Sequence, residues 1–277
     1  MCTSPITIDG QELRCRQCKE CRIQRSSEWA FRATQEYKYA TSGVFLTLTY
    51  DEQNVPWIDS KEGPIQTLDK SDLQKFIKRV RKRDYRHKKN QFHYKIRYMS
   101  CGEYGPTTGR PHYHMLLFNA HKKTIKEIEK CWKIGFVVIG DVEPKSIHYV
   151  TDYIQKERWK RVPPQSKEFN TFSQGFGSQY ISDYQDYHER TKTHLMKTPS
   201  KKERPLLKYY ETKLYSGDAL EQSKKKRIEM FQKLVDERTK EALEKEPLDP
   251  IGYLKKENKK KIKRLDEQVE NRKKRII

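Results

Sequence analysis

Residues 103–118 read EYGPTTGRPHYHMLLF, and this stretch decides how the middle of the chain folds. The mainly apolar run from Pro111 to Phe118 predicts a strand, and the Pro-Thr-Thr-Gly sequence before it is typical of a turn. Residues 95–103, on the other side of that turn, predict the antiparallel partner strand. We therefore expect a hairpin at this point of the chain.

The hairpin is expected to bring a carboxylate and two imidazoles together. Alternate side chains of a strand share a face, so His112 and His114 point the same way, about 7 Å apart. Glu103 lies just across the turn, on the neighbouring strand. This mixed nitrogen and oxygen set suits Mg²⁺ or Mn²⁺ in a phosphoryl-transfer site. The alternative is a pair of exposed histidines that bind no metal, because a His-x-His pattern alone is weak.

Tyrosines recur about forty residues later, in HYVTDYIQK at 148–156. Tyr149, Tyr153 and Lys156 stand at i, i+4 and i+7, on one face of a helix predicted over 147–158. A phenol with its usual pKa near 10 is a weak nucleophile, but a metal can polarise a phosphodiester and a lysine can stabilise the phenolate. We interpret the three residues as catalytic. The alternative is that the tyrosines simply pack where the helix meets the sheet.

The other segments are read from apolar periodicity and from turn residues. Ser71 opens one predicted helix with a capping-box pattern, and its apolar residues follow at helical spacing. The predicted elements are a hairpin in 1–17, a helix at 19–39, a strand at 44–50, a loop at 51–70, a helix from 71, a short helix from 124, a strand at 136–143, a loop after 159 and long helical stretches beyond 214, the last either helical or disordered.

Composition favours a polyanionic partner. The chain has 59 Lys and Arg against 38 Asp and Glu, a net charge of +21, and such an excess is typical of proteins that neutralise phosphates. Arg79, Lys82 and Arg83 on the predicted second helix are the candidate DNA contacts, together with the lysine-rich tail from Lys255. No apolar run reaches the roughly 20 residues that span a bilayer, and no signal peptide is evident, so we expect a soluble intracellular protein.

Cysteines cluster near the start of the chain. Cys15, Cys18 and Cys21 form a CxxCxxC pattern, and Cys2 could return across the Asp9-Gly10 turn as a fourth thiolate for structural Zn²⁺. The spacing equally fits three cysteines that lie along one helix, so both interpretations stay open.

Three ordered motifs resemble those of the HUH endonucleases that initiate rolling-circle replication. They are FLTLTY at 45–50, GRPHYHMLLF at 109–118 and YVTDYIQK at 149–156. The sequence is most similar to the replication initiators of gokushoviruses, small single-stranded DNA phages of the microvirus family. The resemblance covers the chain from its start to about residue 215.

The resemblance implies an α+β fold, with a central antiparallel sheet of about five strands flanked by helices and a site on one sheet face. We expect a cysteine-containing hairpin and helix at 1–40, the endonuclease domain at 41–215 and a basic helical or partly disordered tail at 216–277. One tyrosine would nick the viral strand and hold its 5′ end, and the second would cut the regenerated origin. We favour Tyr153 as the first.

The implied partners are single-stranded and replicative-form DNA at the origin, with a host polymerase and a host helicase, in the cytoplasm of a bacterial host. The phosphate-cradling GxxxxGK[ST] pattern is missing from the sequence, so unwinding is assigned to another protein.

Other functions remain open. A plasmid replication initiator or relaxase would keep the chemistry, although relaxases commonly place the tyrosine before the histidines. A non-catalytic protein that coats single-stranded DNA would need neither metal nor tyrosines. A zinc hydrolase built on the His-x-His pair would leave the tyrosines unexplained.

Overall fold

The computed structural model describes residues 2–85, 95–105, 107–153, 163–196 and 204–274. They form two compact units: Trp29–Gly177, and a second unit made of Met1–Glu28 and Ser178–Ile277. Each unit is described by itself below. The predicted domain boundaries at 40 and 215 stay a prediction.

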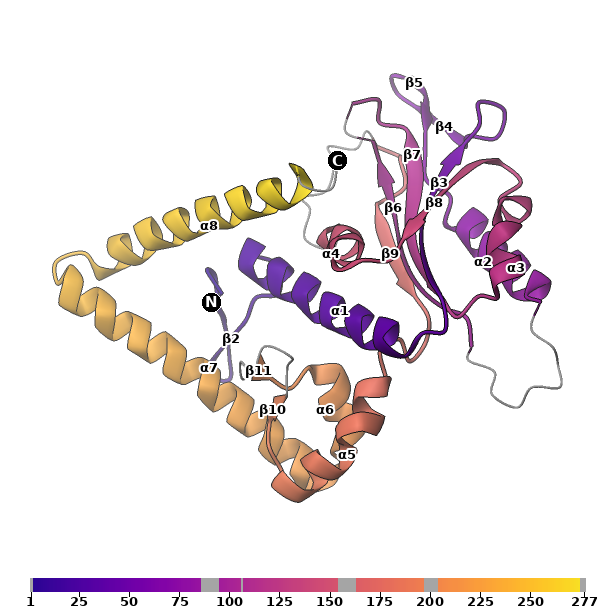
Figure 1. Cartoon of the computed structure of the whole chain (residues 1–277). Helices are drawn as coiled ribbons and strands as arrows, with labels where there is room; N and C mark the ends of the chain where they lie inside the picture. Colours follow the sequence, from indigo (N-terminus) through magenta and orange to yellow (C-terminus); the bar gives the residue numbers. More distant parts are fainter. Residues whose placement is uncertain (1, 86–94, 106, 154–162, 197–203, 275–277) are drawn as a thin grey trace. The chain divides into compact units, whose positions relative to one another are not determined.

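A five-stranded antiparallel sheet forms the centre of the Trp29–Gly177 unit, which confirms the predicted fold class (Figure 1). The strand order is β8-β3-β7-β6-β9, so β8 and β9 are the edges. Strands β6 and β7 form the hairpin predicted from residues 95–118. The strands are β3 (Gly43–Tyr50), β6 (Arg97–Tyr104), β7 (Pro111–Phe118), β8 (Gly135–Asp141) and β9 (Phe169–Phe172).

One face of this sheet packs against helix α2 (Lys70–Arg83), with α3 (Lys122–Lys126) and the short 3₁₀ helix η1 (Ile128–Cys131) beside it. The apolar residues of α2 recur at helical spacing and are all buried, as predicted. They are Leu73, Phe76, Ile77 and Val80, and they pack in one cluster with Leu46, Leu48, Tyr113, Met115 and Leu117 of the sheet.

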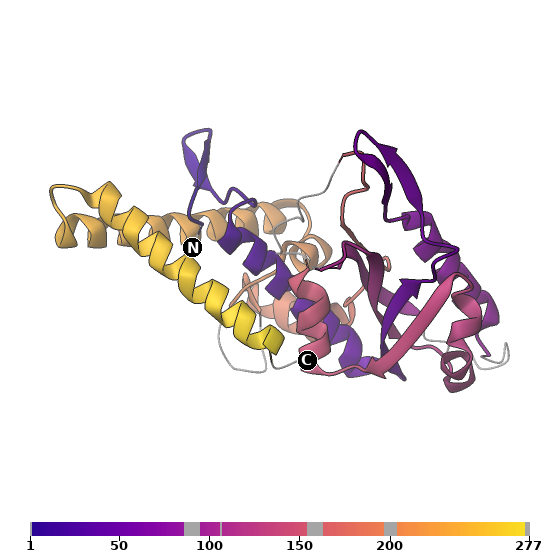
Figure 2. The same cartoon turned by 90° about the horizontal axis from the view of Figure 1, so that it is seen from above.

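The opposite face packs against α4 (Pro144–Asp152) and the part of α1 (Lys19–Tyr39) that belongs to this unit. Ile147 and Val150 of α4 lie in one buried cluster with Leu116 and Phe118 of β7. Figure 1 and Figure 2 both show α4 and α2 on opposite sides of the sheet. The histidines of β7 lie on the α4 side, because they share a strand face with Leu116.

Two predicted loops contain strands, so those predictions are wrong. β4 (Trp57–Ser60) and β5 (Gly63–Gln66) form a hairpin within 51–70, and β9 lies within the loop predicted after residue 159. Gly63 has φ of +106°, a conformation that favours glycine at this turn. Proline in β5 is tolerated because the hairpin stands apart from the main sheet.

Helix α2 also starts earlier than predicted. Its N-cap is Asp69 rather than Ser71, because the Asp69 side chain accepts a hydrogen bond of 2.7 Å from the backbone N–H of Ser71.

The second unit is mainly helical. Its N-terminal hairpin has the predicted Asp9-Gly10 turn, with φ of +50° and +74°. The basic C-terminal segment is helical, broken between α7 and α8 next to Pro250, which is the helical alternative of the prediction. Its elements are β1 (Ile6–Ile8), β2 (Gln11–Leu13), α5 (Gln179–Thr191), β10 (Leu195–Met196), β11 (Arg204–Pro205), α6 (Lys208–Leu214), α7 (Gly217–Lys245) and α8 (Pro250–Lys274). Across the described ranges, we find no helix with the length and apolar character needed to span a membrane.

Candidate active site

The register of β6 and β7 gathers the three predicted metal ligands. Glu103 pairs directly with His112, and His114 lies two residues further along β7. One carboxylate oxygen, Glu103 Oε1, lies 2.9 Å from His112 Nε2 and 3.0 Å from His114 Nε2. Glu103 and His114 are buried, with 4% and 6% of their surface exposed. The sheet therefore presents a compact set of two imidazoles and one carboxylate.

The hydrogen bonds behind the imidazoles fix their orientation. His112 Nδ1 lies 3.1 Å from the carbonyl oxygen of Arg110, so the neutral ring carries its proton on Nδ1 and directs the Nε2 lone pair at Glu103. His114 Nδ1 lies 3.0 Å from the hydroxyl of Thr47. A lone pair that faces a carboxylate oxygen is favourable only with a cation between them. The donor set therefore fits a divalent metal, and it leaves the identity of the ion open.

Helix α4 positions the two predicted tyrosines beside this set. Ser146 Oγ accepts the backbone N–H of Glu143 at 2.7 Å and fixes the first turn. Ile147 and Val150 are buried against the sheet. Tyr149 and Tyr153 then lie near the histidines, because residues four apart share a helix face.

Ring contacts define where the tyrosines lie. The Tyr149 ring meets His114 edge-on at 5.1 Å between centroids, and the Tyr153 ring stacks on the same imidazole at 5.6 Å and 18°. The two phenol rings are 5.1 Å apart. The structure thus brings both tyrosines to one metal-ligand candidate. Lys156, the third predicted catalytic residue, lies outside the described residues.

Both phenols are held in their protonated form. Burial raises the pKa of Tyr149 and Tyr153 above the usual value, and the negative charge of Glu103 raises the pKa of each further. A cation among the three ligands would oppose the effect of the carboxylate.

Two residues of β3 support the site and were not predicted. Phe45 stacks on His114 at 5.6 Å and 8°, and it meets Tyr149 edge-on at 5.9 Å. Thr47 holds the same imidazole through Nδ1. Both lie in the FLTLTY segment, and their alternation along the strand is the signal that could have identified them.

An exposed apolar surface continues across the sheet from the histidines. Phe136 of β8 pairs with Thr49 of β3, and Thr49 pairs with His112 of β7. Directly paired residues point to the same face, so Phe136 lies on the face of the histidines, and so does Val138 by the same pairing through Thr47. They are 67% and 65% exposed.

The predicted DNA contacts of α2 lie on the other face of the sheet. Arg79 donates to the carbonyl of Cys131 at 2.7 Å, and Arg83 pairs with Glu127 at 2.9 Å. Lys82 is exposed. The structure does not bring these residues to the tyrosines, and their contact with DNA stays a prediction.

The four cysteines proposed as zinc ligands also come together. The sulfur atoms of Cys2, Cys15, Cys18 and Cys21 all lie within 4.8 Å of one another. The alternative of three cysteines along one helix is wrong, because Cys15 and Cys18 precede α1 and only Cys21 lies in it. The remaining cysteines, Cys101 and Cys131, are buried.

Residues 43–158 match the family model of replication-associated protein ORF2. This segment contains all three ligands and both tyrosines. Three phage proteins are similar over a longer stretch. Replication-associated protein ORF4 of Chlamydia phage 1 is 30% identical over 62% of this chain and 46% of its own length.

Replication-associated protein VP4 of Bdellovibrio phage phiMH2K is 34% identical over 52% of this chain and 48% of its own length. Replication-associated protein ORF2 of Spiroplasma virus 4 is 31% identical over 54% and 50%. The chain thus spans about half the length of these curated relatives. These matches confirm the resemblance to phage replication proteins that the three motifs predicted. No solved structure matches the chain significantly.

Proposed function

Because residues 43–158 match the family of replication-associated protein ORF2, we propose that this chain initiates rolling-circle replication of a phage genome by nicking DNA with a tyrosine. One observation carries the proposal: two phenols contact His114, whose Nε2 converges with His112 on the Glu103 carboxylate. A nucleophile beside a metal-ligand set is the arrangement that phosphoryl transfer requires.

Glu103, His112 and His114 would hold Mg²⁺ or Mn²⁺. A bound ion would polarise the scissile phosphate and offset its developing charge. The protein's own contribution is orientation: Thr47 and the Arg110 carbonyl fix the two imidazoles, and Phe45 keeps His114 and Tyr149 in place.

The phenol oxygen of one tyrosine would attack the phosphorus of the scissile phosphodiester. A bond forms between that oxygen and phosphorus, and the bond to the 3′ oxygen breaks. The phenol loses its proton and the 3′ oxygen gains one, so the products are a 5′-phosphotyrosine ester and a free 3′ hydroxyl. The ester keeps the energy of the broken bond, and a later attack by a 3′ hydroxyl restores the phosphodiester.

Two tyrosines suit a cycle with two cuts. Tyr149 and Tyr153 contact the same imidazole from different directions, so either can reach a phosphate held there. While one carries the DNA end, the other is available to cut the regenerated origin. Lys156 would stabilise the phenolate, and we assign the first cut to Tyr153.

The partners that follow are single-stranded and replicative-form DNA at the origin. The 3′ hydroxyl would prime a host polymerase, and strand separation would fall to a host helicase. The site of action would be the bacterial host cell, where phage DNA replicates.

The test is incubation of the protein with labelled single-stranded DNA from the origin region and Mn²⁺. We expect a protein–DNA adduct that survives denaturing gels and disappears with EDTA or with Tyr149→Phe and Tyr153→Phe together. Cleavage without an adduct would contradict tyrosine attack and indicate hydrolysis. Tight binding with neither product would instead indicate a non-catalytic DNA-coating protein.

A further inference from the structure

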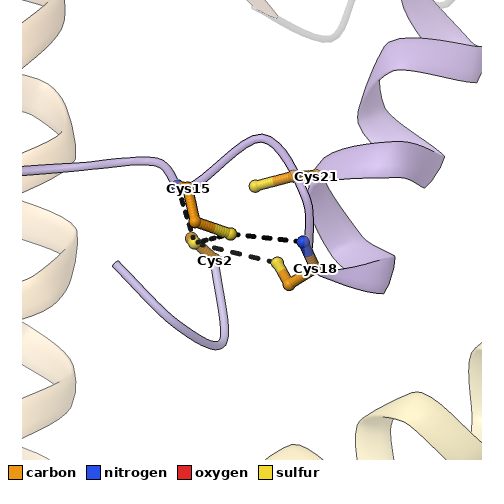
Figure 3. Close-up of side chains that lie close together, drawn as sticks. All are labelled: Cys2, Cys15, Cys18 and Cys21. Atoms are coloured by element: carbon orange, nitrogen blue, oxygen red, sulfur yellow. Dashed lines mark hydrogen bonds between the residues drawn. The ribbon is translucent and has the colours of Figure 1, made fainter. Parts of the chain in front are cut away.

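The cysteine cluster lies in the unit that does not contain the candidate nuclease site. Cys2 precedes β1, Cys15 follows β2, Cys18 stands immediately before α1 and Cys21 lies in the first turn of α1. Figure 3 shows the four side chains converging from the hairpin and the helix start. From this geometry we propose that the four thiolates bind one structural Zn²⁺ ion, which joins the N-terminal hairpin to α1.

The sulfur separations match a tetrahedral mononuclear centre. Zinc–sulfur bonds of about 2.3 Å in a tetrahedron place the sulfurs about 3.8 Å apart. Cys2 Sγ lies 3.5 Å from Cys15 Sγ and 3.7 Å from Cys18 Sγ. A disulfide needs about 2.05 Å, and a multinuclear iron–sulfur cluster spreads its cysteines over a larger core. The distances therefore favour a single ion.

Backbone N–H groups are already directed at the sulfurs. Cys15 Sγ accepts from the N–H of Gln17 at 3.4 Å and of Cys18 at 3.2 Å, and Cys2 Sγ accepts from the N–H of Cys15 at 3.4 Å. Arg16 makes this tight turn possible with φ of +59°. Such donors stabilise thiolates and orient them toward a metal.

The surroundings suit the charge of the centre. Four thiolates and one Zn²⁺ carry two negative charges in total, and the sequence RCRQCKECR places basic residues between the cysteines. The N-terminus of α1, a helix of 21 residues, begins directly after Cys18. Its positive end favours a negative group at this position.

An apolar shell covers one side of the cluster. Phe231 and Val235 of α7 pack against the cysteines, and Cys2, Cys21 and Phe231 are buried. The guanidinium of Arg14 lies 5.4 Å from the centre of the Phe231 ring. This shell restricts access of water and chelators, as expected for a structural rather than a catalytic ion.

The experiment is metal analysis of the full chain purified without chelator. We expect one equivalent of zinc, lost in Cys18→Ser and retained in two controls. Cys131→Ala removes a buried thiol outside the cluster. Glu103→Gln removes a ligand of the candidate nuclease site, so it distinguishes the two metal centres and leaves the nicking proposal a separate question.

Cobalt substitution keeps the test decisive if Cys18→Ser does not fold. The unmodified chain loaded with Co²⁺ should show thiolate-to-cobalt charge transfer and the intense visible bands of a tetrahedral tetrathiolate. Folded, metal-free protein with all its thiols titratable would overturn the proposal. So would disulfides among the four cysteines, or iron recovered together with acid-labile sulfide.

Discussion

The ring of Tyr153 stacks on the imidazole of His114, 5.6 Å between centroids and 18° from parallel. The candidate nucleophile therefore rests on a candidate metal ligand, while the far side of that imidazole is bonded to Thr47. Any change that turns the His114 ring should disturb metal binding and tyrosine chemistry together. This coupling decides which substitutions are informative.

Glu103→Gln should weaken Mn²⁺ binding and slow adduct formation by at least about 100-fold, because it removes the charged ligand that both histidines face. Mn²⁺ titration followed by electron paramagnetic resonance gives the affinity, and denaturing gels give the rate. Glu127→Gln is the matched control on the other face of the sheet. Unchanged Mn²⁺ affinity in Glu103→Gln would contradict the ligand assignment.

Thr47→Val should reduce Mn²⁺ affinity about 10- to 100-fold, because the hydroxyl 3.0 Å from His114 Nδ1 is lost while the shape is kept. The measurement is the same titration. Thr49→Val is the control, since Thr49 lies on the same strand face one pair further along. If the two variants bound Mn²⁺ equally well, orientation by Thr47 would be ruled out.

Phe136→Ala should weaken binding of single-stranded DNA about 5- to 150-fold, the loss expected when one stacked base is released. The reason is that an exposed aromatic ring lies on the sheet face of the histidines. Fluorescence anisotropy with EDTA present measures binding without cleavage. Ile139→Ala, an exposed apolar residue on the opposite face of β8, should have little effect, and equal losses in both variants would refute base stacking at Phe136.

Tyr113→Phe should lower the free energy of unfolding by about 1–3 kcal/mol and leave Mn²⁺ binding unchanged. Its buried hydroxyl donates to the carbonyl of Asp69 at 2.8 Å and lies 2.6 Å from the hydroxyl of Tyr50. Urea denaturation measures the loss. Tyr113 points away from the histidines it separates, so a fall in Mn²⁺ affinity would show that the two sheet faces are not independent.

The hairpin that holds the ligands could be predicted because its signals are local. A turn sequence joins two strands, and alternation along β7 places His112 and His114 on one face. The same reasoning predicted α1 and α2, whose apolar spacing is regular. The Asp9-Gly10 turn was predicted by its residue types.

What could not be predicted depends on strand order and register. Phe136 lies on the face of the histidines only because β8 pairs with β3, which a single sequence does not reveal. The contacts of Phe45 and Thr47 with His114 follow from the pairing of β3 with β7. β4, β5 and β9 were missed because Gly63 and Pro64, and the glycines after β9, outweighed their weak strand character.

The most direct measurement is mass spectrometry of the DNA-linked peptide. The protein is reacted with labelled origin-region DNA and Mn²⁺, digested with nuclease and protease, and the modified residue is mapped. We predict a 5′-phosphotyrosine on Tyr153 in the wild type, shifted to Tyr149 in Tyr153→Phe. A DNA link on any other residue, or efficient cleavage with no linked peptide, would contradict tyrosine-mediated nicking at this site.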